Sequence, residues 1–179
     1  MKGKASIGVV RKSGGQKKKH ATQMTPEEIT CIKKQVFRAL RENNNRIKTQ
    51  VHLVDKIIDE VTDYDPKAFR QALEDLEHTL IEYSHKEKNN GVNIYKKRIT
   101  VKCKPIYKVI LNGEITDCHL IVVMDINKST VVTSWFNDVN DNHETINWSR
   151  YDQNTKIISN NLKNGRRGSK KRNKNGVDK

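Results

Sequence analysis

Between residues 25 and 83, apolar residues recur at helical spacing. Thr25, Pro26 and Glu28 predict a helix start, because they supply an N-cap, a proline at the first helical position and a glutamate at the capping-box position. The apolar stripe that follows consists of Ile29, Ile32, Val36, Phe37 and Leu40. Three asparagines at 43–45 end the pattern, so we expect the first helix to end there.

Two more helices are expected in this half of the chain. The second covers about residues 49–61, and its apolar stripe is Val51, Val54, Ile57, Ile58 and Val61. The third starts at Asp65 and Pro66, again a cap followed by a proline, and runs to about Tyr83. Its inward residues are Phe69, Leu73, Leu76 and Leu80.

After a polar loop at 86–90, the pattern changes from helical to alternating. Strands are expected over residues 94–104, 106–111, 114–124 and 129–136. Asn112 and Gly113 predict a two-residue hairpin turn, because both of its positions need a positive φ. Helices followed by an antiparallel meander of about four strands predict an α+β domain, with the helices on one face of the sheet.

Charge divides the 179 residues into three parts. The net charge is +14, yet residues 26–158 carry equal numbers of basic and acidic residues, so the excess lies at the two ends. Both ends are poor in large apolar residues and cannot bury enough surface to fold alone. We therefore expect a disordered basic arm at 1–24, a single α+β domain at 25–158 and a disordered basic tail at 159–179. Within the domain, the expected parts are helices over 26–83, a sheet over 94–136 and a C-terminal extension over 137–158.

The basic ends are typical of segments that bind polyanions. Nucleic acid is the expected partner, although solubility alone also accounts for such runs. A membrane surface is disfavoured, because no Trp, Phe or Leu is interleaved with the lysines. The expected phosphate-binding residues of the arm and tail are Lys17, Lys18, Lys19, Arg166, Arg167, Lys170, Lys171 and Arg172.

Several classes of protein are excluded by missing patterns. No apolar run approaches the ~18 residues of a membrane span, and no apolar stretch follows the basic start as in a secretory signal. The three cysteines form no CxxC pair, which favours a reducing, cytoplasmic compartment. No P-loop, dinucleotide-binding, nucleophile-elbow or zinc-protease motif occurs. We expect no cofactor and no metal site.

Four side chains are candidates for chemistry. His52 lies on the polar face of the second helix, one turn before Lys56, where a histidine is usually just solvated. His119 alternates with apolar strand residues, a pattern equally typical of a core histidine. Thr133 and Trp135 lie on the last strand; the tryptophan can stack on a base or pack in the core.

The segment from His52 to Lys56, followed by a helix and a four-strand meander, resembles the RelE-like branch of the barnase–EndoU–colicin–RelE (BECR) ribonucleases. More narrowly, it resembles phage endoribonucleases of the RegB kind and small toxin-like domains. The resemblance covers about residues 50–136. It implies RNA cleavage without a metal, in which the ribose 2′-hydroxyl attacks the adjacent phosphate. The long first helix, the basic ends and the extension through Tyr151 depart from the RelE pattern.

On this resemblance, His52 and His119 are the expected acid and base, with Thr133 and Tyr151 as further candidates. The expected phosphate- or RNA-binding residues of the core are Lys56, Arg98, Lys102, Lys104 and Trp135. An endoribonuclease tethered to RNA or ribosomes is therefore the first hypothesis. The alternatives are a non-enzymatic nucleic-acid-binding or ribosome-associated protein that uses its basic arms, and a toxin-like domain held by a protein antitoxin.

Overall fold

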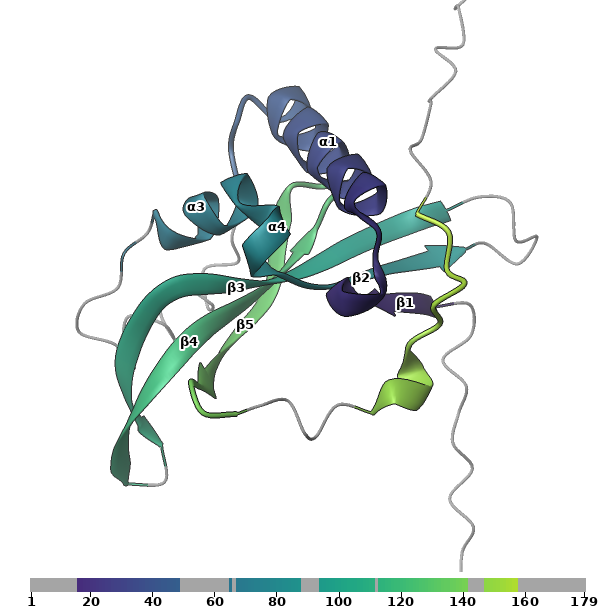
Figure 1. Cartoon of the computed structure of the whole chain (residues 1–179). Coiled ribbons are helices and arrows are strands. Elements are labelled where there is room, and N and C mark those ends of the chain that lie inside the picture. Colours follow the sequence, from purple (N-terminus) through teal and green to yellow (C-terminus); the bar gives the residue numbers. More distant parts are fainter. Residues whose placement is uncertain are drawn as a thin grey trace, which may run out of the picture.

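A computed structural model of the chain describes residues 16–48, 65, 67–87, 94–111, 113–141 and 147–157. The fold is α+β: a five-stranded antiparallel sheet is covered on one face by helices (Figure 1). The expected fold class is therefore confirmed, with one strand more than predicted. In the described ranges, no helix is long and apolar enough to cross a membrane.

The strands follow one another across the sheet in chain order, and each neighbouring pair is antiparallel. They are β1 (Gln16–His20), β2 (Leu80–Glu87), β3 (Ile94–Leu111), β4 (Glu114–Asp125) and β5 (Thr130–Asp138). The predicted hairpin turn joins β3 to β4: Leu111 pairs with Glu114, and Gly113 has a φ of 86°. A positive φ at this position is the conformation that glycine adopts without strain.

The first helix, α1 (Pro26–Glu42), begins and ends as the sequence predicts. The Thr25 side chain accepts a hydrogen bond from the Glu28 N–H, and the Glu28 carboxylate accepts one from the Thr25 N–H at 3.0 Å. Asn43 caps the other end, and residues 44 and 45 turn the chain with positive φ. The other helical elements among the described residues are α3 (Ala68–Glu74), α4 (Leu76–Thr79) and the short 3-10 helices η1 (Ala21–Gln23) and η2 (Trp148–Arg150).

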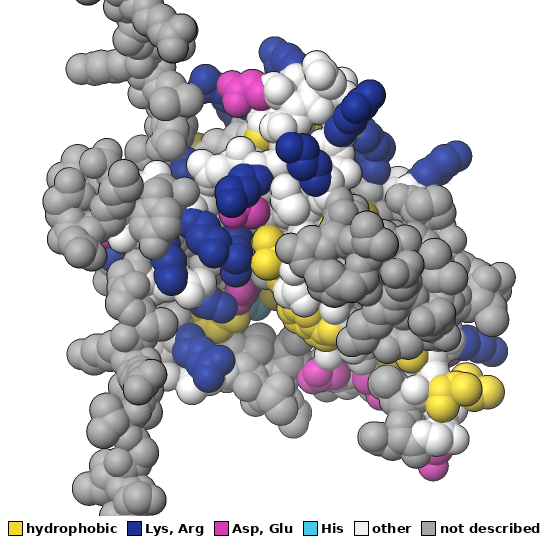
Figure 2. Space-filling model, turned by 180° about the vertical axis from the view of Figure 1, so that it is seen from behind, with side chains coloured by type: hydrophobic (Ala, Val, Ile, Leu, Met, Phe, Trp, Pro, Cys, Tyr) yellow, Lys and Arg dark blue, Asp and Glu magenta, His cyan; other side chains and the backbone are white. Residues whose placement is uncertain are grey.

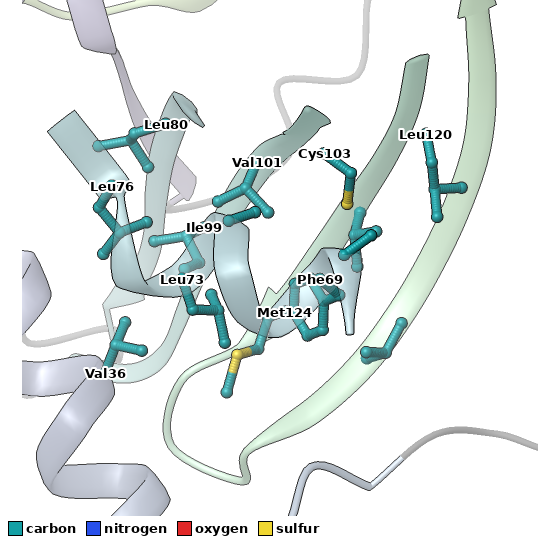
Figure 3. Close-up of a cluster of buried hydrophobic side chains, with 14 of the residues drawn as sticks. Val36, Phe69, Leu73, Leu76, Leu80, Ile99, Val101, Cys103, Leu120 and Met124 are labelled. Carbon is teal, nitrogen blue, oxygen red and sulfur yellow. The ribbon is translucent and has the colours of Figure 1, made fainter. Parts of the chain in front are cut away.

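The hydrophobic core lies between the helices and the face of the sheet that they cover (Figure 3). Phe69, Leu73 and Leu76 of α3 and α4 contact side chains that alternate along β3 and β4. The fully buried strand residues include Ile99, Val101, Cys103, Cys118 and Met124. Of the predicted α1 stripe, Ile29 is only partly buried and Phe37 is 36% exposed, since Phe37 lies at the edge of the stripe.

The third predicted helix is divided at Asp75 into α3 and α4, and it is wrong over its last turn. Residues 80–83 begin β2 instead, and Tyr83 is fully buried there. Strand pairing to both β1 and β3 satisfies the backbone of this segment, which outweighs its helical apolar spacing. The two strands predicted over 94–104 and 106–111 are one long strand, β3, with a register shift between Lys102 and Ile106 around Pro105. A proline has no N–H to donate, so an irregularity at this point is expected.

The predicted disordered arm at 1–24 is wrong from Gln16 onward. Residues 16–20 form β1, which pairs with β2 through Lys18 and Ser84, and residues 21–23 form η1. The helix expected at about 49–61, with its His52 and Lys56, lies outside the described residues, as do residues 1–15 and the tail at 159–179.

The C-terminal extension passes across the outer edge of the sheet. The Asp152 N–H donates to the Lys18 carbonyl at 2.8 Å, and Ile157 then packs against the core on the helix side. The outer strand β1 is therefore partly covered, which limits pairing of this edge with other chains.

Candidate nucleic-acid interface on the open face of the sheet

The face of the sheet turned away from the helices, here called the open face, carries most of the candidate residues that the structure describes. Side chains alternate between the two faces along a strand. Because Ile99, Val101 and Met124 point to the core, Arg98, Lys102 and the odd-numbered side chains of β4 from 117 to 123 lie on the open face. The open-face residues of interest are Lys18, Glu82, Lys86, Lys96, Arg98, Thr100, Lys102, His119, Thr133 and Trp135.

A groove of about 340 Å³ lies on this face, closed on one side by the C-terminal segment. Strands β1 to β5 and residues 147–151 all contribute to it, so its walls come from both ends of the described chain. Its lining residues are Lys18, Ile81, Glu82, Thr100, Ile121, Trp135, Asn137, Asp141, Asn147, Arg150 and Tyr151. We call this the open-face groove.

Glu82 joins three elements at the floor of the open-face groove. Its carboxylate accepts hydrogen bonds from Lys18 Nζ at 3.1 Å, from Thr100 Oγ1 at 3.3 Å and from the Tyr151 hydroxyl at 2.7 Å. Burial raises the pKa of Tyr151 above its usual value, and the hydrogen bond to Glu82 raises it further. At neutral pH Tyr151 is therefore a protonated donor, and it fixes the C-terminal segment to the sheet.

Aromatic rings line or border the groove. Trp135 is 42% exposed, although it lies on a strand in register with the buried Ile121. Trp148 is also exposed and meets His20 edge to face, with ring centroids 5.1 Å apart. An exposed ring on a sheet surface offers a face on which a base can stack.

Cations surround the groove on the same face. Lys86, Lys96, Arg98 and Lys102 take part in none of the ion pairs found in the described part of the chain. Asp125 lies opposite Arg98 in the register, but its carboxylate accepts from the Lys128 N–H at 3.2 Å. Figure 2 shows such a group of Lys and Arg side chains beside hydrophobic ones on one side of the molecule. Cations interleaved with aromatic rings are typical of surfaces that bind single-stranded nucleic acid.

His119 and Thr133 lie on the open face, but they do not meet. His119 pairs with Asn137 in the register, and Thr133 pairs with Val123. Four residues along a strand amount to about 13 Å, too far for two groups to act on one phosphate. His119 does not line the groove, and its Nδ1 is buried without a hydrogen-bond partner among the described residues.

Four predicted phosphate ligands have other partners. Lys104 lies on the helix side and forms an ion pair with Asp75, because the irregularity around Pro105 turns its side chain there. The pKa of Asp75 falls to about 2, chiefly because His78 and then Lys104 hydrogen-bond to the carboxylate. Lys17 pairs with Glu87 at 3.2 Å, and Lys19, almost fully buried, pairs with Glu28 at 2.7 Å. Of the Lys17–Lys19 run, Lys18 is the residue that lines the groove, where it is paired with Glu82 at 3.1 Å.

The remaining candidate residues are not among those that the structure describes. His52, Lys56, Arg166, Arg167, Lys170, Lys171 and Arg172 are not among the described residues. In the described part of the chain, no group of three or more His, Cys, Asp or Glu side chains is placed to hold a metal ion.

Six residues of this surface were missed by the sequence analysis. Glu82 falls in a stretch predicted as helix and Lys86 in one predicted as a loop. The other four carry no motif of their own: Lys96, Thr100, Trp148 and Arg150. The one available signal was the basic and aromatic composition of 94–104 and 147–151. Comparisons of the chain with protein-family models, curated proteins and solved structures give no match.

Proposed function

We propose that this protein binds single-stranded RNA on the open face of its sheet. The observation that supports this most strongly is the open-face groove, which combines the exposed Trp135 with Arg150 and lies beside open-face cations of β3 that form no ion pair in the described part of the chain. Lys18 also lines the groove, although its ammonium group is paired with Glu82. Bases stack on the ring while the cations neutralise phosphates, and neither contact selects a sequence. The activity belongs to the cytoplasm, where free thiols such as those of Cys103 and Cys118 stay reduced.

Fluorescence anisotropy with a labelled single-stranded RNA at fixed salt tests the proposal. Trp135→Ala should weaken binding about tenfold, because one base loses its stacking partner. Phe37→Ala is the matched control, since Phe37 is similarly exposed but lies on the helix side. Equal affinities for both variants and the wild type would contradict the proposal.

A second pair of variants tests the charges. Lys102→Gln removes a cation from the open face, whereas Lys104→Gln removes one from the same strand on the helix side. We expect weaker RNA binding for Lys102→Gln alone. A larger loss for Lys104→Gln would place the interface on the other face. Single-stranded DNA of the same sequence, measured in parallel, reports the preference for RNA.

RNA cleavage is the second candidate function, as the RelE-like resemblance implies. The observation that favours it is the approach of a carboxylate, a phenol and an ammonium group at Glu82, Tyr151 and Lys18. General acid–base cleavage needs such groups beside one phosphate. His119 lies apart from them on the open face, so its role in cleavage and that of His52 are separate hypotheses.

Incubating labelled RNA with purified protein in EDTA tests cleavage. Products ending in 2′,3′-cyclic phosphate that disappear with His52→Ala, His119→Ala or Glu82→Gln would assign the acid and base. If the wild type binds the RNA and never cuts it, cleavage is refuted and RNA binding is the function that remains. Poor expression of the wild type, rescued by His52→Ala, would support the toxin-like alternative and a protein antitoxin as partner.

A further inference from the structure

A second, smaller pocket lies on the open face where β1, β2 and β3 run together. Its volume is about 70 Å³. The lining consists of three cations and three uncharged polar residues, with no carboxylate: Lys86, Lys96, Arg98, Gln16, Ser84 and His85. The His85 side chain alternates with those of Ser84 and Lys86 and therefore points to the helix side of the sheet, so His85 adds no charge to the pocket.

The strand register forces like charges together in this pocket. Lys86 lies directly opposite Lys96, and Arg98, next on the same face of β3, lies opposite Ser84. Like charges directly across a sheet destabilise it. Two carboxylates of the same face lie beside the pocket, and both have other partners. Glu82 is paired with Lys18 at 3.1 Å, and Asp125, which lies opposite Arg98 in the register, accepts a hydrogen bond from the Lys128 N–H at 3.2 Å. An anion between the three cations would remove their repulsion.

Arg98 supplies a directed donor as well as a charge. Its Nε is buried and has no hydrogen-bond partner among the described residues. A buried guanidinium N–H without an acceptor is costly, and a planar guanidinium matches the oxygens of a phosphate. Ser84 adds a hydroxyl opposite Arg98, and Gln16 adds an amide opposite Lys86. The pocket therefore offers donors of several kinds to one oxyanion.

Size selects among the possible anions. One water molecule needs about 10–15 Å³ of cavity volume. The pocket therefore has room for roughly five to seven atoms of the size of a water oxygen. A phosphate group has five heavy atoms, whereas a nucleoside is several times larger. We propose that this pocket, here called the phosphate pocket, binds a single phosphate group. The phosphate is either the terminal monoester of a nucleic acid or one of its internal diesters.

The phosphate pocket adjoins the open-face groove. Ser84 of the pocket pairs with Lys18, which lines the groove, and lies two residues from Glu82 on the groove floor. Two residues along a strand advance about 7 Å, so a strand of RNA in the groove can place a phosphate in the pocket. The binding of an RNA phosphate in the pocket therefore rests on the proposed function, whereas the binding of free phosphate does not.

Titration of the ¹⁵N-labelled full chain with inorganic phosphate, followed by NMR, tests the pocket. The Arg98 Nε–H resonance should shift, and Lys96→Gln or Arg98→Gln should weaken phosphate binding about tenfold, as expected for the loss of a charge-assisted contact. Lys108→Gln is the matched control, because it removes an exposed lysine from the same face of β3 outside the pocket. An unshifted Arg98 resonance, or equal binding by all variants, would overturn the proposal.

RNAs of one sequence with a 5′-phosphate or a 5′-hydroxyl distinguish the two sources. Tighter binding of the phosphorylated RNA, lost in Lys96→Gln, assigns the pocket to the terminal monoester. Equal binding of both RNAs, weakened alike in Lys96→Gln, assigns it to an internal diester. Phosphate binding without RNA binding would refute the proposed function and leave the pocket standing. RNA binding that Lys96→Gln and Arg98→Gln leave unchanged would refute the pocket's part in it.

Discussion

Glu82 accepts hydrogen bonds from three parts of the fold that are remote in sequence: Lys18 in β1, Thr100 in β3 and Tyr151 in the C-terminal segment. A carboxylate that is mostly removed from water costs free energy unless it is paired in this way. The same three bonds shape the open-face groove, so stability and site geometry depend on one side chain.

Removing one of these bonds should lower stability without unfolding the protein. We expect Tyr151→Phe to lower the free energy of unfolding by about 1.5 kcal/mol, because a hydrogen bond to a charged acceptor is lost. Urea unfolding measures the change. Thr133→Ala is the control, since Thr133 is exposed on the same face, and it should have little effect. Equal unfolding midpoints for Tyr151→Phe and the wild type would contradict the bond.

His85 makes stability depend on pH. The side chain is buried in β2, bonded to Glu87 at 3.1 Å with Lys17 and Lys97 nearby, and burial lowers its pKa below the ordinary 6.5. The unfolded chain therefore binds a proton at higher pH than the folded chain does. Stability should fall as the pH drops below about 6.5 and through the lowered pKa, and should not change through this group at higher pH.

Thermal unfolding between pH 5 and 8 tests this dependence. His85→Gln should flatten the curve, whereas His78→Gln, at an exposed histidine, should keep its slope. Identical slopes for the wild type and His85→Gln would show that another group causes the loss of stability at low pH.

At the scale of elements, the sequence predicted those whose signals are local. Thr25, Pro26 and Glu28 lie within one turn and define the start of α1, and Gly113 defines the β3–β4 hairpin. The first half of β2 was predicted as helix because Leu73, Leu76 and Leu80 have helical spacing. Its strand conformation is set by two neighbouring strands, and single-sequence patterns do not report such pairing.

β1 shows the same limit more clearly. Residues 16–20 are mostly lysine and look like a solvated arm. They form a strand because β2 provides the backbone hydrogen-bond partners. In addition, Lys17 forms an ion pair with Glu87, and Lys19 forms one with Glu28. The candidate site could be predicted in part for the same reason: Lys18, Arg98 and Trp135 stand out by type, whereas Glu82 matters only through the groups that reach it.

Truncation separates β1 from the arm before it. Deleting residues 1–15 should leave the melting temperature nearly unchanged, because this segment is basic and has few large apolar side chains to bury. Deleting residues 1–22 removes β1 and the Lys18–Glu82 contact, and should lower the melting temperature by many degrees. Circular dichroism melts measure both. A fold that tolerates the longer deletion would show that β1 is dispensable.

For the whole molecule, charge is divided between the ends of the chain and the open face. Residues 1–15 and 158–179 carry twelve Lys and Arg and one Asp. Deleting both segments should reduce the slope of log affinity against log salt, since fewer counterions are released from RNA. Residual salt-dependent binding should remain through Lys18, Lys102 and their neighbours. A truncated protein that binds RNA with no salt dependence would place all phosphate contacts in the ends.

The distance along the chain between β1 and its partner has a consequence for how the protein is made. Lys18 and Glu82 are 64 residues apart, and Tyr151 joins the same carboxylate from 69 residues further on. Contacts this remote form slowly, after local hairpins such as β3–β4. During synthesis β1 leaves the ribosome first, yet it cannot pair until β2 has followed. We therefore expect the sheet to grow from β3 and β4 outward, with the first strand translated among the last to dock.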